Sequence, residues 1–418
     1  MKPSSGMEGS SASKTVPFTA DDVAEWAAFG PKLLEKPATP EDLQVLRSRK
    51  LKMTSMKKRL AEETKWSERA IERELNRLVE QLKSVDTTPA YQLDNKHPDN
   101  IKDHRRENGP LLNLLWSKNE PLHGQTLYLG GEVGSDGKIY CIPGHASKVL
   151  LIDTETDEVT QIGPELTSNG RLYKWLRGIV VGDIIYGLPC HADEILKIHV
   201  PSHTVTKLPI PYETFYSNPE EAKEEREMIW KYHGGTICPI DDCIYAIPQR
   251  AHHVLKFDPK TETVSFHGPK LEGYCKWYGG ILGKQDGAIY GIPQNASGVL
   301  RITPDSVTVH GDFGENQHNW HGGAAATNGV IVSVPANASS CLCITPGDPP
   351  SLKLIGDSDV IKSGRHRNDG KYKYLGAMCG TNGKVYIFPC ASEYVLQVDT
   401  EKMEAKNGGE SQCVTNTM

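Results

Sequence analysis

Apolar residues follow two different periods along the chain, and the change between them falls near residue 110. Within residues 68–83, Ile71, Leu75, Leu78, Val79 and Leu82 recur every three or four positions, which is typical of an amphipathic helix. Beyond residue 110, short segments alternate apolar and polar residues with the period of two expected of β-strands. The pattern therefore predicts a helical segment followed by an all-β region.

Three helix starts are readable before residue 110. Thr19 precedes two aspartates and resembles an N-cap, Pro40 suits a first helical position, and Ser67 opens the amphipathic run. We therefore predict a disordered tail at residues 1–18 and an α-helical segment at residues 19–88. A polar linker with three prolines is predicted at residues 89–110.

Six repeats of one pattern fill the rest of the chain. Each copy opens with a short aromatic phrase followed by small residues, with Tyr or Trp at its second position, at residues 127–131, 174–178, 231–235, 276–280, 319–323 and 373–377. A second strand then ends in proline, at Pro143, Pro189, Pro248, Pro293, Pro335 and Pro389. A third begins six positions later, at Val149, Ile195, Val254, Val299, Cys341 and Val395. Such self-similarity is the signature of a repeat architecture.

The repeat predicts a six-bladed β-propeller of four-stranded antiparallel blades over residues 111–406, preceded by the α-helical segment. Glycine allows strands to crowd toward a central axis, and proline ends a hydrogen-bonded ladder. The sixth copy has a weak fourth strand, residues 403–406, so we expect the apolar residues 111–116 to complete the last blade. Residues 407–418 are predicted to be a disordered tail.

The glycine pair after a hydrophobic strand resembles the kelch type of β-propeller repeat. The second strand, as in residues 289–293 (Ile-Tyr-Gly-Ile-Pro), also resembles uncharacterised propeller repeats of protist proteins. Kelch blades usually carry a tryptophan downstream, which these units lack. The resemblance implies a fold and, for kelch-like propellers, a role in protein interaction.

Composition narrows the function. The net charge of −6 argues against binding to a nucleic-acid backbone. Neither a run of 18 apolar residues nor a secretory signal is readable, and the ten cysteines form no CxxC pair. We therefore predict a cytoplasmic protein with free thiols, without membrane or nucleic-acid binding, and with no cofactor and no metal site.

Candidate ligand-binding residues lie on loops that a propeller brings to one face. They form a predicted funnel rim, made of His145, His191, Lys174, Lys231, Arg250, Lys276, Asn295, Asn337 and Lys373. Such a rim could attract a carboxylate, a phosphate or an acidic peptide. The alternative is structural, because Asn and His suit turns and lysine stems can cover aromatic rings.

Other positions favour packing or remain open. His233 and His321 share a position with leucines and are interpreted as core, while Trp175, Trp277 and Trp320 are interpreted as packing between blades. Residues 219–230 predict an acidic helix, either a solvated elaboration or a docking element, and residues 363–367 form a basic insertion. We identify no catalytic motif.

We therefore predict an interaction scaffold or adaptor that binds a protein partner. The alternative is a propeller that binds a small molecule or an anion, a hydrolase among the options, with its site in the central funnel.

Overall fold

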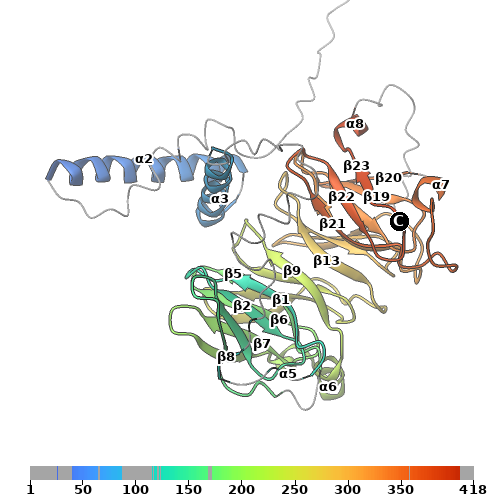
Figure 1. Ribbon diagram of the computed structural model, residues 1–418, viewed down its shortest axis with the longest axis horizontal. Helices are drawn as coiled ribbons and strands as arrows, with labels where there is room; N and C mark the ends of the chain where they lie inside the picture. The colour runs from blue at the N-terminus through green and yellow to red at the C-terminus, as the bar shows by residue number, and fades with distance from the viewer. Residues whose placement is uncertain are drawn as a thin grey trace, which may run out of the picture.

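The computed structural model describes residues 26, 40–64, 66–86, 115, 117–119, 122, 124–167, 172–356 and 358–404. Figure 1 shows two long helices beside a group of antiparallel sheets. The predicted tails, the linker at residues 89–110 and the helix start at Thr19 lie outside the described residues. Within them, an all-β region preceded by helices is confirmed.

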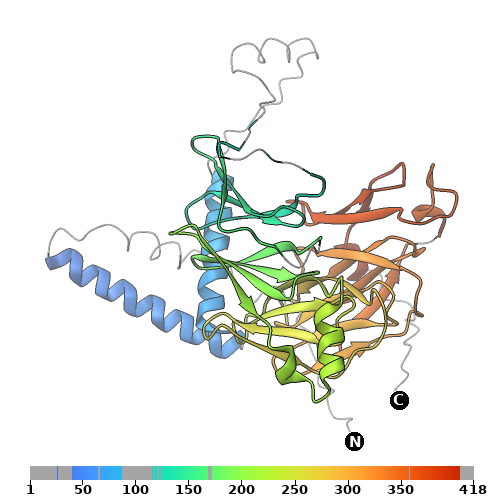
Figure 2. The same ribbon diagram turned by 90° about the horizontal axis from the view of Figure 1, so that it is seen from below.

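The N-terminal helices begin where the sequence predicts. Helix α2 (Pro40–Thr64) has proline at its first position, and α3 (Glu68–Asp86) follows Ser67. The Ser67 hydroxyl caps α3 by accepting a hydrogen bond from the Ala70 N–H at 3.1 Å. Apolar side chains of both helices pack together with Trp26, in a cluster that includes Met56, Leu60, Ile71 and Leu75. Figure 2 shows α2 extending away from the sheets.

The first three sheets each contain four consecutive strands. The first has β1 (Tyr128–Val133), β2 (Ile139–Pro143), β3 (Val149–Asp153) and β4 (Glu158–Ile162). The second has β5 (Trp175–Val181), β6 (Ile184–Pro189), β7 (Glu194–His199) and β8 (Thr204–Pro209). The third has β9 (Tyr232–Ile237), β10 (Ile244–Pro248), β11 (Val254–Asp258) and β12 (Thr263–His267).

The remaining sheets continue the order. The fourth has β13 (Trp277–Leu282), β14 (Ile289–Pro293), β15 (Val299–Ile302) and β16 (Val307–His310). The fifth has β17 (Trp320–Ala325), β18 (Ile331–Pro335), β19 (Cys341–Thr345) and β20 (Ser351–Ile355). The sixth has three strands, β21 (Tyr374–Cys379), β22 (Val385–Pro389) and β23 (Leu396–Val398). Each second strand ends at the predicted proline.

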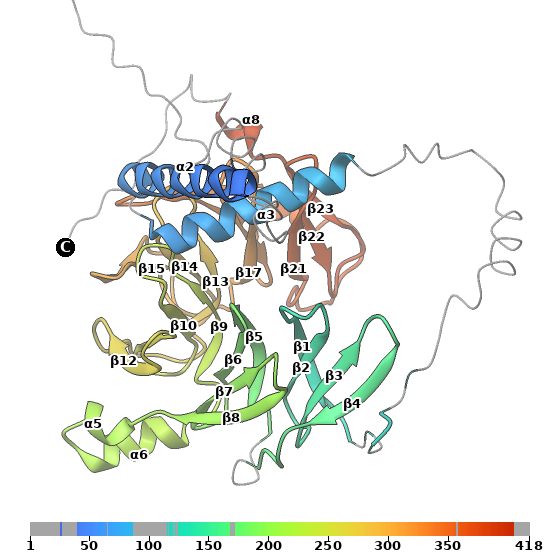
Figure 3. The same cartoon turned by 90° about the vertical axis from the view of Figure 1, so that its left-hand side faces the viewer.

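The sheets surround a common centre, as Figure 3 shows, with the first strand of each sheet innermost. Consecutive innermost strands contact one another from β1 through β5, β9, β13 and β17 to β21. Each begins at one face and ends at a turn on the other. We call the face where the innermost strands begin the crown face, and the opposite one the turn face.

Close approach at the centre explains the glycines of the repeat. A Cβ atom on Gly234 would lie 3.0 Å from the Gly279 Cα atom of the next sheet, and both residues have positive φ. Their small size lets neighbouring innermost strands touch through backbone.

The hydrophobic core lies between the sheets. Trp175 packs with Tyr140 and Ile142 of the preceding sheet, and Trp277 packs with Tyr245 and Ile247. Trp320 repeats this packing with Tyr290 and Ile292. The interpretation of these tryptophans as packing between units is confirmed.

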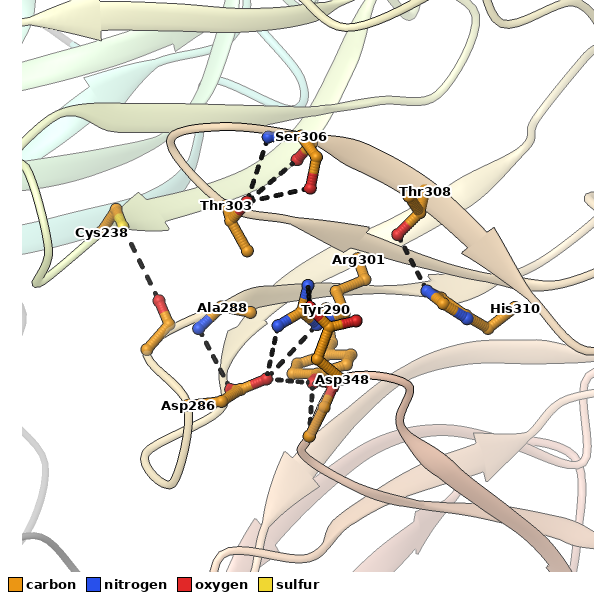
Figure 4. A network of polar contacts seen from close by, with 12 residues as sticks. Cys238, Asp286, Ala288, Tyr290, Arg301, Thr303, Ser306, Thr308, His310 and Asp348 are labelled. Carbon is orange, nitrogen blue, oxygen red and sulfur yellow. Dashed lines mark hydrogen bonds and ion pairs between the residues drawn. The ribbon is translucent and has the colours of Figure 1, made fainter. Parts of the chain in front are cut away.

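The tyrosine of the second strand has a polar partner that the sequence analysis did not identify. The Tyr290 hydroxyl donates to Asp286 Oδ2 at 2.6 Å in the preceding turn, and Arg301 pairs with the same carboxylate (Figure 4). Tyr140 and Tyr245 donate in the same way to aspartates four residues earlier. The hydrogen bond therefore fastens each turn to its strand.

The end of the repeat differs from the prediction. Residues expected to form a weak fourth strand lie partly in helix α8 (Glu401–Glu404), so that prediction is wrong for Met403 and Glu404. Glu, Lys and Met are strong helix formers, which accounts for the difference. The third strand of the sixth sheet begins at Leu396, one residue later than expected.

The predicted closing strand is only partly described. Residues 111–114 and 116 lie outside the described residues, so its pairing with the last sheet stays a prediction. Just beyond it, Ser117 forms a parallel bridge with Val159 of β4, and the Lys118 N–H donates to the Val159 carbonyl. The described part of this segment therefore follows the outer edge of the first sheet.

Short helices occupy the insertions. Helices α5 (Tyr212–Phe215) and α6 (Pro219–Glu227) precede β9, and α7 (Ser358–Ile361) precedes β21. The predicted acidic helix is thus confirmed as α6, which buries Ala222 and Glu225. Among the helices of the described residues, none has the length and apolar character needed to cross a membrane.

Candidate functional site

The crown face is built from one backbone feature repeated six times. The residue that precedes each unit's opening position has positive φ in every unit, at Thr126, Tyr173, Trp230, Cys275, His318 and Tyr372. The carbonyl of each accepts an N–H from the residue two positions beyond the proline, at positions 145, 191, 250, 295, 337 and 391. We call the six positive-φ residues, the residues directly before them and the six residues that donate to them the crown. Positive φ is uncommon for residues other than glycine.

Four of the nine predicted rim residues are lysines, and the structure buries them. Lys174, Lys231, Lys276 and Lys373 are at most 3% exposed. Their ammonium groups donate to backbone carbonyls of the preceding unit, as Lys276 Nζ does to the Arg250 and Ala251 carbonyls at 3.0 and 2.9 Å. Burial lowers the pKa of Lys174, Lys276 and Lys373 to about 8. These lysines therefore join neighbouring sheets.

Asn295 and Asn337 also join sheets. The Asn295 amide donates to the Tyr274 carbonyl at 3.0 Å and accepts the His318 N–H of the next unit at 2.9 Å. Asn337 repeats the arrangement with the Gln317 carbonyl and the Tyr372 N–H. These hydrogen bonds support a structural role for the two asparagines. A ligand-binding role for them stays a prediction.

His145, His191 and Arg250 differ, because their side chains meet aromatic rings of the crown. The His145 ring lies 4.3 Å from the Tyr173 ring, and His191 lies 4.6 Å from Trp230. The Arg250 guanidinium lies 4.1 Å from the centre of the Tyr274 ring, a distance at which cation–π attraction acts. The sequence predicted these three residues but not the aromatic partners.

Apolar side chains are exposed along the same loops. Leu172, Ile229, Tyr274 and Tyr372 are between 37% and 53% exposed. A groove of about 440 Å³ lies nearby, lined by Asn319, Trp320, Asn337 and other residues of the fourth and fifth units. The crown thus combines aromatic rings, an arginine and exposed apolar groups, the composition of protein-binding surfaces.

Charged insertions flank the crown at the third and sixth units. Helix α6 exposes Glu220, Glu221 and Glu224, and its buried Glu225 accepts a hydrogen bond from the His252 N–H at 3.0 Å. The basic insertion is tied to the sixth unit by the Arg365–Glu393 ion pair at 3.3 Å. Both insertions are therefore fixed to the sheets, and their charges are opposite.

A second polar cluster lies at the centre, below the crown. The Tyr278 ring stacks between the rings of His233 and His321, at 3.7 and 3.6 Å. Burial lowers the pKa of His233 to about 3 and raises that of Tyr278 to about 12. Both histidines pack as predicted, and they do so by stacking on the ring of Tyr278, a contact that the sequence analysis did not predict.

Comparison with known proteins yields fold likeness alone. No family model matches the chain, and no curated protein matches it. Among solved structures, virginiamycin B lyase from Staphylococcus aureus is 13% identical and aligns 67% of this chain with 83% of its own, at a TM-score of 0.49. Kuenenia stuttgartiensis hydrazine synthase is 11% identical and aligns 71% of this chain with 84% of its own, at a TM-score of 0.47. These neighbours are β-propeller proteins.

Proposed function

We propose that the chain is a six-bladed β-propeller scaffold that binds a protein partner through its crown. The exposed apolar residues of the crown carry this proposal, because they project from loops whose backbone is held at positive φ. Backbone strain of this kind, repeated in every unit, fixes the direction of each side chain. A preorganised aromatic surface loses little side-chain entropy on binding.

Chemistry of the crown indicates the kind of partner. Aromatic and arginine side chains are enriched where protein interfaces bind most strongly, and Trp230, Tyr274 and Arg250 lie on adjacent units.

Charge on the flanks favours one orientation of the partner. The exposed glutamates of α6 and the basic residues Lys362, Arg365 and Lys371 lie on units three apart in the six-unit order. A partner with complementary charge would bind in one direction, since electrostatic complementarity sets orientation and association rate.

The test is affinity purification with matched variants of the full chain. We expect the wild type to retain a specific partner that Ile229→Asp and Tyr274→Ala lose. Val309→Asp, which changes an apolar residue of similar exposure on β16 away from the crown, should retain it. Retention by the crown variants equal to that of the wild type would contradict the proposal.

A further inference from the structure

One position of the innermost strands separates the second unit from the other five. The third residue of the opening strand is glycine at positions 130, 234, 279, 322 and 376, and it is Arg177 in the second unit. The six innermost strands carry one carboxylate, Glu132, and one guanidinium, that of Arg177. Arg177 therefore takes the position at which glycine, in the other units, lets the innermost strands approach one another.

A cavity lies beside Arg177. It has a volume of about 60 Å³ and is formed by β5 and β9, with Leu176, Arg177 and Ile179 on one side and His233 and Gly234 on the other. Leu188 and Tyr232 complete its apolar wall. The innermost strands of the second and third sheets therefore leave a cavity between them at the position where arginine replaces glycine.

Polar groups at this cavity lack protein partners. Arg177 is exposed, and among the described residues its guanidinium has no ion pair within 4 Å and no hydrogen bond. The same holds for hydrogen bonds of the His233 ring nitrogens. Arg177 also acts electrostatically on the pKa of His233.

Charge at the site suits a monoanion. His233 is neutral at pH 7 because burial lowers its pKa to about 3, so Arg177 supplies the one formal positive charge of the lining. Glu132 acts on Arg177 from the first sheet, and burial raises the pKa of its carboxyl group. A phosphate dianion would exceed the available positive charge, whereas a carboxylate matches it.

We propose that this axial cavity binds a carboxylate group, with the Arg177 guanidinium as its principal partner. Arginine holds carboxylates through two parallel N–H···O bonds. A His233 ring N–H supplies a further donor at the same cavity. The cavity is large enough for the carboxylate group and small enough to exclude a bulky anion. This site is independent of partner binding at the crown.

The carboxylate could belong to a small molecule or to the C-terminus of a peptide, and titration calorimetry of the full chain distinguishes these sources. The probes are acetate, N-acetylglycine, and an acetylated glycine tripeptide with a free or an amidated C-terminus. Binding of acetate and both acids indicates recognition of the carboxylate alone. Binding of the free-acid tripeptide, but not acetate, indicates a chain terminus. Either result supports the site if the amide fails to bind.

Arg177→Gly is the decisive variant, because it gives the second unit the residue of the other five and should fold. We expect it to weaken carboxylate binding at least tenfold, in line with the loss of charge-assisted hydrogen bonds. Arg177→Lys should weaken it less, and Glu132→Gln should strengthen it. Arg69→Ala, a change at an exposed arginine of α3 that does not line the cavity, should leave binding unchanged.

A local readout accompanies the titration. With the histidines labelled with ¹³C, carboxylate binding should shift the ring resonances of His233 in the wild type but not in Arg177→Gly. The proposal is overturned if no carboxylate probe binds the wild type, if Arg177→Gly binds as well as the wild type, or if inorganic phosphate binds more tightly than acetate.

Discussion

At the scale of single residues, the buried lysines show how one side chain can join two sheets. Lys276 is 2% exposed, and its ammonium group donates to the carbonyls of Arg250 and Ala251, which follow the second strand of the preceding unit. Its backbone N–H donates to the Gln249 carbonyl of that preceding unit. A charged group is thus held by peptide dipoles, and burial lowers its pKa.

This arrangement predicts a pH effect on stability. The folded pKa of Lys276 is about 8, below the ordinary value of 10.5, so between these values the unfolded chain binds more protons than the folded one. The contribution of Lys276 to the free energy of unfolding therefore increases as pH rises from 8 to 10, by at most about 1.4 kcal/mol per pH unit.

Lys276→Met isolates this effect, because other titrating groups are common to both proteins. We expect the destabilisation caused by the substitution to increase between pH 8 and pH 10, as measured by urea unfolding at each pH. A difference between the two proteins that stays constant with pH would contradict the assignment.

The sequence predicted the positions of single residues but not the atoms that they contact. The sequence predicted Lys276 at the entry to an innermost strand and Asn295 in the loop after a second strand, and β13 begins at Trp277 while β14 ends at Pro293. Their partners are backbone carbonyls of neighbouring units, which carry no residue-type signal. Arg177 departs from the glycine of the other five units, yet its meaning depends on which strands meet at the centre.

At the scale of elements, the innermost strands depend on glycine for two separable reasons. Gly234 has a φ of +84° and no room for a Cβ atom against Gly279. Gly182, in the turn after β5, has a φ of +59° but nothing within 4 Å of such an atom. Comparing Gly182 with Gly234 therefore separates the cost of a positive φ from the cost of a close contact between strands.

We expect Gly182→Ala to lower the free energy of unfolding by about 1 kcal/mol, the cost of placing alanine at positive φ. Gly234→Ala should cost clearly more, because β9 and β13 must also move apart. Thermal unfolding of both variants measures the difference. Equal losses would show that the contact across the centre does not constrain residue type.

The boundaries of strands and helices were predictable where a particular residue type ends a strand or starts a helix. Proline ended all six second strands, and Ser67 and Pro40 marked two helix starts. The strand expected near Met403 was wrong because the repeat suggested a strand while the local residues favour a helix. The Asp286–Tyr290 bond could have been found from aspartate four residues before tyrosine, a spacing that recurs in the first and third units.

At the scale of the whole molecule, helix α3 is attached to the turn face by few contacts. The Ser67 N–H donates to the Pro239 carbonyl at 2.6 Å, and Arg73 pairs with Asp242 at 3.1 Å. Glu74 pairs with Lys284 at 3.1 Å. The helices were predicted from their periodicity, but this attachment was not, since it joins residues 169 to 210 positions apart.

We expect Arg73→Glu to release α3 from the sheets, because it places a carboxylate beside Asp242, which is 5% exposed. Hydrogen exchange should then increase in the first turns of α3 while β9 and β10 stay protected. Asp242→Arg in the same chain should restore part of the protection. If α3 exchanges at the wild-type rate in Arg73→Glu, the ion pair does not hold it.

The last sheet provides a test of how the repeat ends. In five units the residue before the proline packs against the next sheet, and Ile247 is fully buried. Phe388 takes this position in the sixth unit and is 43% exposed. The closing strand predicted at residues 111–116 would cover it, whereas the described structure leaves it partly open.

Substitution by alanine distinguishes these alternatives. From its exposure we expect Phe388→Ala to cost about 1 kcal/mol or less, against about 2–5 kcal/mol for Ile247→Ala in the core. Urea unfolding of the two variants gives the comparison. A cost for Phe388→Ala as large as that for Ile247→Ala would mean that further chain covers the sixth sheet, as the sequence predicts. Stability at this one position therefore reports whether the propeller closes on itself.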